Sequence, residues 1–399
     1  MISPQVWKKP ENLLYVMAIA MALAFGVWQA LLNNFVIERA SFSGVEIGIL
    51  QSLREIPGFL AFTVVFLLLF MREQTLGLTA LLFLGVGTAV TGFFPSEIGL
   101  YATTVLMSVG FHYYETINQS LSLQWFDKKT AAHKMGKVIA VRSFASLIAF
   151  GFVWLLLDMF KVDMEVVYML GGGACVVLAL FCWGMFPRFN HGVEQHKKII
   201  LRKRYWLFYA LTFMSGARRQ IFVVFAGFLM VEKFGFDAAA ISVLFLINGA
   251  MNMFFAPRIG KLISRLGEKS ALGLEYIGLF IVFVGYAFVE SPWVAVVLYI
   301  VDHLLFSMAI AIKTYFQKIA DPKDIAPTAG VSFTINHIAA VVLPALYGVL
   351  WIASPSAVFL TGALLALGSL ILSRLIPNNP EPGCEVVWKT RPLASEAAE

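Results

Sequence analysis

Long apolar runs alternate with short polar segments along the chain, from Leu13 to Leu375. A helix needs about 20 mostly apolar residues to cross the hydrocarbon core of a bilayer, and these runs are long enough to do so. The pattern therefore predicts an all-α, polytopic membrane protein with 12 transmembrane helices. The predicted spans are residues 12–37, 45–71, 75–94, 97–120, 136–158, 165–186, 205–231, 238–260, 270–289, 292–316, 328–351 and 354–375.

Composition agrees with a membrane protein and argues against other classes. The 399 residues are 59% hydrophobic and only 14% charged, whereas roughly a quarter of the residues of a soluble domain are charged. A pI of about 9.1 could indicate a nucleic-acid partner, but in a membrane protein it is typical of basic cytoplasmic loops. The 3 cysteines are too few and too scattered for a disulfide framework or a zinc site.

No sequence motif indicates an enzyme. The chain has no GxxxxGK[ST] phosphate loop, no His/Cys metal spacing and no nucleophile motif. We therefore expect no catalytic residues, no cofactor and no metal, and no nucleic-acid partner.

Lysine and arginine are distributed unevenly among the predicted loops. With the N-terminus inside, only Arg39, Lys161 and Lys233 fall in outside loops, whereas basic runs such as 128–137 and 197–204 fall inside. Because positive residues concentrate in cytoplasmic loops, both termini are expected to be cytoplasmic. We expect a monomer in a bacterial inner (plasma) membrane.

The two sides of the central polar segment each hold six predicted spans. We expect an N-terminal half over 1–186, a basic cytoplasmic linker over 187–204, a C-terminal half over 205–376 and a disordered cytoplasmic tail over 377–399. A shift of 194 positions aligns several features of the halves and predicts an internal duplication. The matches are Glu38-Arg39 with Glu232-Lys233, Phe42 with Phe236, Ile47 with Ile241, Leu50 with Leu244, Asp127 with Asp321, and Gly136 with Gly330.

One loop carries a local motif. The segment Gly260-Lys261-Leu262-Ile263-Ser264-Arg265-Leu266-Gly267-Glu268-Lys269, between spans eight and nine, resembles the cytoplasmic signature of the major facilitator superfamily (MFS). Ser264 stands where the family has an aspartate, and the matching first-half loop, 70–73, is degenerate. The resemblance implies the MFS fold, alternating access, and a substrate site at the midplane between parallel halves. It also implies that spans one, four, seven and ten line a cavity, that two, five, eight and eleven flank it, and that the other four face lipid.

Ionisable side chains in the second span are the first candidates for function, because such groups are costly in hydrocarbon. Arg54 and Glu55 are adjacent, so they are not expected to face each other squarely, and each should need a partner on another helix. Arg54 is a candidate substrate contact and Glu55 a candidate proton carrier. A structural interhelical ion pair remains the alternative.

The first and fourth spans supply further candidates. Glu115 is a proton-coupling candidate if burial keeps it protonated, but pairing with Arg142, at similar depth in the next span, is favoured. Tyr113 is a substrate-stacking candidate and Gln29 a substrate-binding candidate, although packing and helix–helix hydrogen bonding are the more common roles of such side chains.

Two adjacent arginines lie near the middle of the seventh span. Arg218 and Arg219 point about 100° apart on a helix, and a guanidinium group suits a carboxylate or phosphate. They are the best indication of an anionic substrate. The alternative is that they neutralise Asp302, Glu55 or both.

The tenth span carries Asp302 and His303 at its middle, and both are proton-coupling candidates. Asn248 in the eighth span and His337 in the eleventh are substrate-binding candidates, with structural hydrogen bonding as the alternative. Of the four spans expected to face lipid, spans three, six and twelve carry no charge in their cores, and span nine carries only Glu275, near its cytoplasmic end.

These observations favour a secondary active transporter that moves a small solute, with an organic anion as the leading class, by alternating access and with proton coupling. A facilitative carrier or efflux permease without proton coupling is the alternative, and a receptor or scaffold on a transporter fold is a third interpretation. The expected partners are the solute, protons and the lipid bilayer.

Overall fold

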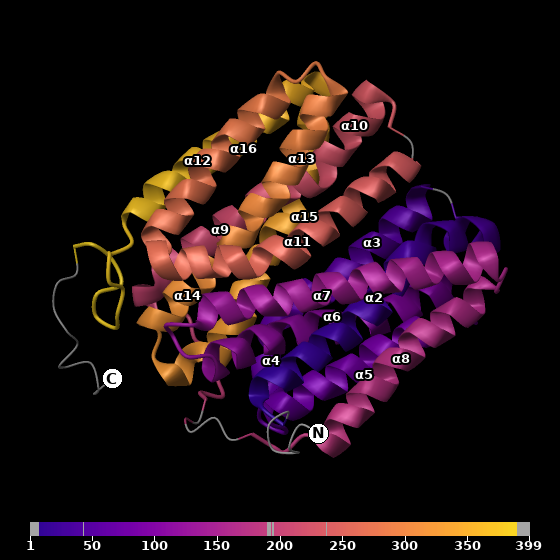
Figure 1. Cartoon of the computed structure of the whole chain (residues 1–399), viewed down its shortest axis with the longest axis horizontal. Helices are drawn as coiled ribbons and strands as arrows, with labels where there is room; N and C mark the ends of the chain where they lie inside the picture. Colours follow the sequence, from indigo (N-terminus) through magenta and orange to yellow (C-terminus); the bar gives the residue numbers. More distant parts are fainter. Residues whose placement is uncertain (1–7, 43, 190–192, 194, 237, 389–399) are drawn as a thin grey trace. The chain divides into compact units, whose positions relative to one another are not determined.

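The computed structural model describes the chain except residues 1–7, 43, 190–192, 194, 237 and 389–399. The described part is helical almost throughout (Figure 1). In the first half the elements are α2 (Pro10–Ala40), α3 (Gly44–Phe59), η1 (Leu60–Thr63), α4 (Val64–Leu67), α5 (Glu73–Thr91), α6 (Glu97–Trp125), α7 (Ala131–Trp154), η2 (Leu155–Met159) and α8 (Met164–Met185). In the second half they are η3 (Lys203–Tyr205), α9 (Trp206–Gln220), η4 (Ile221–Ala226), α10 (Gly227–Phe234), α11 (Ala238–Leu266), α12 (Glu268–Ala287), α13 (Pro292–Phe306), η5 (Ser307–Ala309), α14 (Ile310–Ile319), η6 (Pro322–Asp324), α15 (Ile325–Ala353) and α16 (Pro355–Arg374).

Each predicted span corresponds to one helix or to one run of consecutive helices, so the prediction of 12 transmembrane helices is confirmed. Within the described residues, 10 helices are long and apolar enough to cross a membrane. The other two, α6 and α15, have 29 residues each, which gives a length of about 44 Å. The chain is therefore an integral, multi-pass membrane protein.

Four of the spans are not continuous α-helices. A 3-10 turn separates α3 from α4 and another separates α13 from α14, while π-helical turns follow α7 and α9. In the first case Pro57 lies inside α3 and cannot donate a backbone hydrogen bond. The π turn η4 begins two residues after the arginine pair of α9. Local irregularities of this kind are frequent at functional sites.

The chain forms two compact units. Unit 1 comprises residues 1–125, 140–199 and 326–334, and unit 2 comprises 126–139, 200–325 and 335–399. The main division falls between Ile199 and Ile200, inside the predicted linker. The start of α7 groups with the second half and the start of α15 with the first, so the compact units differ from the sequence halves in two short segments.

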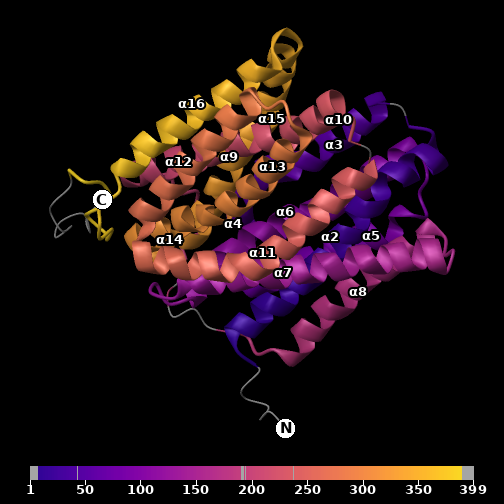
Figure 2. The ribbon, with the colours of Figure 1, turned by 45° about the horizontal axis from the view of Figure 1, so that its top comes forward.

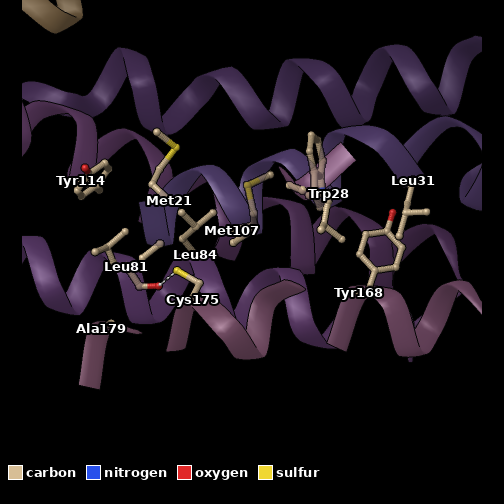
Figure 3. Packing of buried hydrophobic residues seen from close by; sticks show 14 of the residues in the cluster. Met21, Trp28, Leu31, Leu81, Leu84, Met107, Tyr114, Tyr168, Cys175 and Ala179 are labelled. Atoms are coloured by element: carbon tan, nitrogen blue, oxygen red, sulfur yellow. Dashed lines mark hydrogen bonds between the residues drawn. The ribbon is translucent and has the colours of Figure 1, made fainter. Parts of the chain in front are cut away.

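The core of unit 1 is built on close contacts between α5, α6 and α8. A Cβ atom placed on Gly110 of α6 would lie only 2.2 Å from the backbone N of Leu84. Because small residues let helix backbones approach, α5 and α6 pack tightly without a hydrophobic driving force in lipid. Around this contact lie Met21, Leu84, Met107 and Tyr114 (Figure 3).

In unit 2 the corresponding role falls to α12 and α16, which run side by side in Figures 1 and 2. Here a glycine faces a side chain of the neighbouring helix, whereas Gly110 in unit 1 faces backbone. A Cβ atom on Gly362 of α16 would lie 2.7 Å from the ring of Phe283, which is a side chain and not backbone.

The ends of α2 and α10, which the predicted duplication aligns, have the same local structure. Ser41 and Gly235, which are 194 positions apart, both adopt the left-handed conformation, with φ of 54° and 68°. Each ends its helix with the same backbone hydrogen bond. Phe42 N donates to Val36 O at 3.0 Å, and Phe236 N donates to Met230 O at 3.1 Å.

A second pair of loops repeats in the same register. Asp127 Oδ1 accepts a hydrogen bond from Lys129 N, and Asp321 Oδ1 accepts one from Lys323 N, both at 2.9 Å. Each aspartate therefore forms the same local turn after the fourth helix of its half. The matches found in the sequence reflect a shared local structure at these positions.

The prediction of a disordered tail is wrong for residues 377–388, which fold back on unit 2. Tyr315 donates a hydrogen bond to the carbonyl of Glu385 at 2.6 Å, and Trp388 stacks on Trp206. Val386 is buried. These contacts join the tail to α9 and α14, so local composition could not predict them. Residues 389–399 lie outside the described residues.

Candidate functional site

In the first half, one ion pair links two spans. Arg142 Nη1 on α7 lies 3.1 Å from each carboxylate oxygen of Glu115 on α6. The favoured pairing of these two residues is confirmed. The Arg142 side chain is 39% exposed and the Glu115 side chain 18% exposed, so solvent reaches part of this neutral pair.

The expectation that Arg54 and Glu55 do not face each other is wrong, although each of them also contacts another helix. Arg54 Nη2 lies 2.5 Å, and Nε 3.1 Å, from Glu55 Oε1. Adjacent residues point about 100° apart on a helix, but the long arginine side chain bends back to reach its neighbour. Glu55 Oε2 also lies 4.0 Å from His112 Nε2, and Arg54 lies over the Trp28 ring at 6.0 Å.

The two uncharged candidates of the first half, Gln29 and Tyr113, differ in their exposure. Gln29 is exposed on α2. Tyr113 is half-buried, and its hydroxyl shares a hydrogen bond of 2.6 Å with Thr63 Oγ1. Tyr113 therefore ties α6 to the 3-10 turn between α3 and α4, while Gln29 is accessible.

The second half contains a charged cluster in its interior. Arg218 of α9 and Glu275 of α12 are both 0% exposed, with Arg218 Nη2 3.7 Å from Glu275 Oε1. Arg218 also lies over the Tyr276 ring at 4.5 Å and donates to Ser369 Oγ of α16. The cluster thus joins three helices of unit 2.

Asp302 of α13 belongs to the same cluster. It is 0% exposed, and Arg218 and Glu275 are the charged groups that act on it electrostatically. Neither carboxylate oxygen of Asp302, and neither of Glu275, has a hydrogen-bond partner among the described residues. Buried charged oxygens without partners are costly. The cluster has one guanidinium for two carboxyl groups, so pairing alone does not neutralise it.

The two adjacent arginines have different environments. Arg218 is fully buried, whereas Arg219 is exposed. Arg219 acts electrostatically on His303 of α13, whose Nδ1 lies 3.1 Å from Tyr299 O. The His303 ring also packs edge-on against Phe222 of η4. One residue therefore belongs to the buried cluster and the next faces outward, as the helical angle predicts.

Two polar candidates flank this region within unit 2. Asn248 of α11 is buried, and neither its amide nitrogen nor its oxygen has a partner among the described residues. One turn further along, Asn252 accepts a hydrogen bond from Ser307 of η5 at 2.9 Å. His337 of α15 is buried. Asn252 joins two helices, whereas Asn248 keeps its hydrogen-bonding capacity free.

Outside the spans, the linker is tied to the start of α15. Tyr205 donates to Asp324 Oδ2 at 2.8 Å, and Arg202 forms a two-pronged pair with the same buried carboxylate. The hydrogen bond to Asp324 raises the pKa of Arg202 above its ordinary value. This connection holds the end of the linker to unit 2.

The structure brings together Arg218 and Asp302 and adds a residue that the sequence did not single out as functional. Glu275 was expected to be a charge near the end of a lipid-facing span, but it is fully buried against Arg218. The available signal was a single carboxylate inside an apolar run, seven positions after the start of α12. Such a residue needs an interior partner, and only the side-chain contact between α9 and α12 in the folded protein shows that the partner is Arg218.

The sequence pattern of the family described as Major Facilitator Superfamily matches residues 12–344. No curated protein sequence matches the chain. Among solved structures, the human organic anion transporter MFSD10 (TETRAN) matches with a TM-score of 0.76 and 12% identity, covering 91% of this chain and 98% of that one.

Two further solved structures are similar over the same extent. The transporter FucP in the outward conformation matches with a TM-score of 0.74 and 15% identity, over 92% of this chain and 98% of that one. A bacterial homologue of the iron transporter ferroportin in its outward-facing state matches with a TM-score of 0.71 and 12% identity, over 92% and 98%. These matches show that the fold is shared.

Proposed function

Because the chain belongs to the Major Facilitator Superfamily and is a membrane transporter, we propose that it is a secondary active transporter coupled to protons. It moves a small solute by alternating access of its two six-helix halves. The observation that carries this proposal is the buried cluster of Arg218, Glu275 and Asp302.

The charges of the cluster do not balance unless a proton is bound. With Arg218 positive and both carboxyl groups ionised, a net negative charge would sit in a fully buried site. Isolated buried charge costs several kcal/mol or more. One proton shared by Glu275 and Asp302 makes the cluster neutral. Two carboxyl groups that compete for one cation are a known arrangement for holding a proton.

Such a cluster can change its proton affinity when its packing changes. If α9 or α13 shifts, Arg218 can exchange one carboxylate partner for the other, and the released carboxylate then takes up or releases a proton. The π turn η4, three residues after Arg218, and the 3-10 turn η5 after α13 provide local irregularities where such a shift is accommodated. Glu55, Glu115 and His303 are secondary candidates, since both glutamates already have an arginine partner.

We propose an organic anion as the solute. Arg219 is the arginine suited to bind it, because Arg219 is exposed whereas Arg218 is committed to the cluster. A guanidinium group matches a carboxylate in two-pronged geometry. One protein with a similar fold, human MFSD10, is an organic anion transporter. Asn248, buried with an unpartnered amide, is the residue proposed to add a hydrogen bond.

The orientation follows from the distribution of basic residues. The predicted inside loops carry most of the lysines and arginines outside the spans, including Lys128, Lys198 and Arg202. We assign these loops to the cytoplasm of a bacterial cell, with both termini inside.

The test is uptake of organic anions into proteoliposomes with and without an imposed pH gradient. The wild type is expected to transport faster with the gradient, and Asp302→Asn and Glu275→Gln to lose that dependence. Glu115→Gln is the matched control, since its carboxylate is already neutralised by Arg142, and it should retain the dependence. Transport by the wild type that ignores the gradient would exclude proton coupling.

A facilitative carrier is the second candidate, because the same cluster can serve only to hold α9, α12 and α13 together. In that case Asp302→Asn would lower stability without changing the response to pH. Loss of uptake in Arg219→Gln, with uptake retained in the exposed control Arg188→Gln, is the result expected for an anionic solute. Unchanged uptake in Arg219→Gln would remove this residue from the substrate site.

A further inference from the structure

One face of α11 near its C-terminal end is strongly basic. Arg258, Lys261 and Arg265 follow each other at intervals of three and four residues, so their side chains lie on the same face of the helix, and all three are exposed. Arg265 lies one residue before the end of α11, and Arg258 lies about 10 Å further from that end along the helix axis. The stripe thus runs from the end of α11 into the predicted span 238–260.

Two hollows lie along this stripe. One, of about 390 Å³, is lined by Phe255, Arg258, Ile259, Lys261, Leu262 and Arg265. The other, of about 320 Å³, is lined by His133, Met253, Phe254, Pro257, Arg258 and Lys261. Arg258 and Lys261 border both, so the two hollows meet at these two cations. We call the combined surface the basic groove.

The second hollow has a fixed wall because α7 and α11 approach very closely in unit 2. A Cβ atom on Gly260 would lie 2.3 Å from Ala132 O, and one on Gly136 would lie 2.3 Å from Ala256 O. His133 Nδ1 lies 3.0 Å from Pro257 O. The groove is therefore set by helix packing and by a proline inside α11, and not by mobile loops.

The charge of the basic groove is not compensated by the protein. Among the described residues, Arg258, Lys261 and Arg265 form no ion pair, although Arg258 donates to the carbonyl of Phe254. By contrast, the charge of Lys318 is compensated, because its Nζ lies 2.8 Å from a carboxylate oxygen of Glu268. Three uncompensated positive charges on one face favour an anionic occupant.

The lining of the basic groove also includes exposed apolar side chains, which favour a ligand with an apolar part. Phe254 and Phe255 are 55% and 40% exposed, and Leu262 is 37% exposed. A soluble anion such as phosphate would use the cations and leave these apolar surfaces without a partner. A phospholipid provides both parts, with its phosphate at the guanidinium and ammonium groups and an acyl chain along the phenylalanines.

We propose that the basic groove is a binding site for an anionic phospholipid, distinct from the solute path and independent of the proposed function. The phosphodiester binds Arg258 and Lys261, where the two hollows meet, and Arg265 binds further oxygens of the headgroup. Because α7 and α11 form the groove together, a bound lipid stabilises their contact.

Native mass spectrometry of the purified full chain tests this directly. The protein in mild detergent is given equal amounts of phosphatidylglycerol and phosphatidylcholine. We expect the wild type to retain phosphatidylglycerol preferentially. The variant Arg258→Gln/Lys261→Gln/Arg265→Gln should lose this preference, by roughly fivefold in affinity for each charge removed.

A matched variant separates the groove from general surface charge. Lys129→Gln/Arg188→Gln/Lys198→Gln removes three exposed basic residues outside the groove and should keep the preference. If the triple groove variant does not fold, Lys261→Gln alone should show the single fivefold step. Equal retention of both lipids by the wild type would overturn the proposal, as would an equal loss in the control variant. Displacement of phosphatidylglycerol by inorganic phosphate would also overturn it, in favour of a site for soluble anions.

Discussion

The two halves share a fold and several loops, but they neutralise their buried charges in different ways. In the first half the two candidate carboxylates each have their own arginine, Glu55 with Arg54 and Glu115 with Arg142, and both pairs are partly exposed. In the second half one fully buried arginine serves two carboxyl groups. The two halves of a similar fold therefore differ. The ion pairs of the first half are neutral by themselves, whereas the cluster of the second half requires a bound proton to be neutral.

The variants with the largest expected difference in stability replace the arginine of one charged group in each half, Arg218 in the second half and Arg142 in the first. Arg218→Met leaves Glu275 and Asp302 buried without a cation and is expected to cost about 3–5 kcal/mol of stability. Arg142→Met breaks a pair that is 39% and 18% exposed, and it should cost only about 0–1 kcal/mol. Thermal unfolding of the two variants in the same detergent measures both. Equal losses would show that the two arginines have equivalent roles.

Packing provides a second contrast. A Cβ atom on Gly110 would lie 2.2 Å from the backbone N of Leu84, whereas one on Gly278 would meet only the side chain of Leu305, at 2.7 Å. Backbone cannot move aside as a leucine side chain can, so Gly110→Ala should destabilise by about 1–3 kcal/mol or more, and Gly278→Ala by less. Unfolding temperatures of the two alanine variants test this order, and a larger loss at Gly278 would contradict it.

Stability should also depend on pH through the buried cluster of the second half. In the folded state the cluster is proposed to hold one proton that its carboxyl groups release on unfolding near neutral pH. The folded state then binds more protons, so stability falls as pH rises, by about 1.4 kcal/mol per pH unit between about pH 6 and 8.

Two variants distinguish this effect from general surface titration. Glu275→Gln leaves one carboxylate for Arg218, so the cluster is neutral without a proton and the slope should flatten. Glu115→Gln should leave the slope unchanged. A wild type whose unfolding temperature is the same across this range would contradict the shared proton.

The sequence predicted the helices because a span requires a long apolar run, and that requirement is local. It also predicted the pairing of Glu115 with Arg142, because depth in the membrane can be counted along each helix. The pairing of Arg54 with Glu55 was missed, since rules for helical spacing describe Cβ positions and not the reach of a flexible arginine side chain.

The other features that the sequence did not predict depend on contacts between segments far apart in the chain. The partnership of Glu275 with Arg218 joins side chains of α12 and α9, and the folding of the tail depends on the contact between Tyr315 and Glu385. No local pattern contains either contact. The candidate site was therefore predicted in its arginine and aspartate, but not in the second acid that sets its charge.

The smallest expected effects come from the repeated helix cap. Ser41 and Gly235 occupy the same place in the two halves and share a left-handed conformation, with φ of 54° and 68°. This conformation costs a residue with a Cβ atom about 1–2 kcal/mol, and glycine far less. Ser41→Gly should therefore stabilise the protein by about 0.5–1 kcal/mol, after the added freedom of the unfolded chain is subtracted, and Gly235→Ser should destabilise it by a similar amount. Opposite shifts of the unfolding temperature would show that the two caps are equivalent. Shifts of the same sign would mean that one cap is held by its surroundings and not by its backbone conformation.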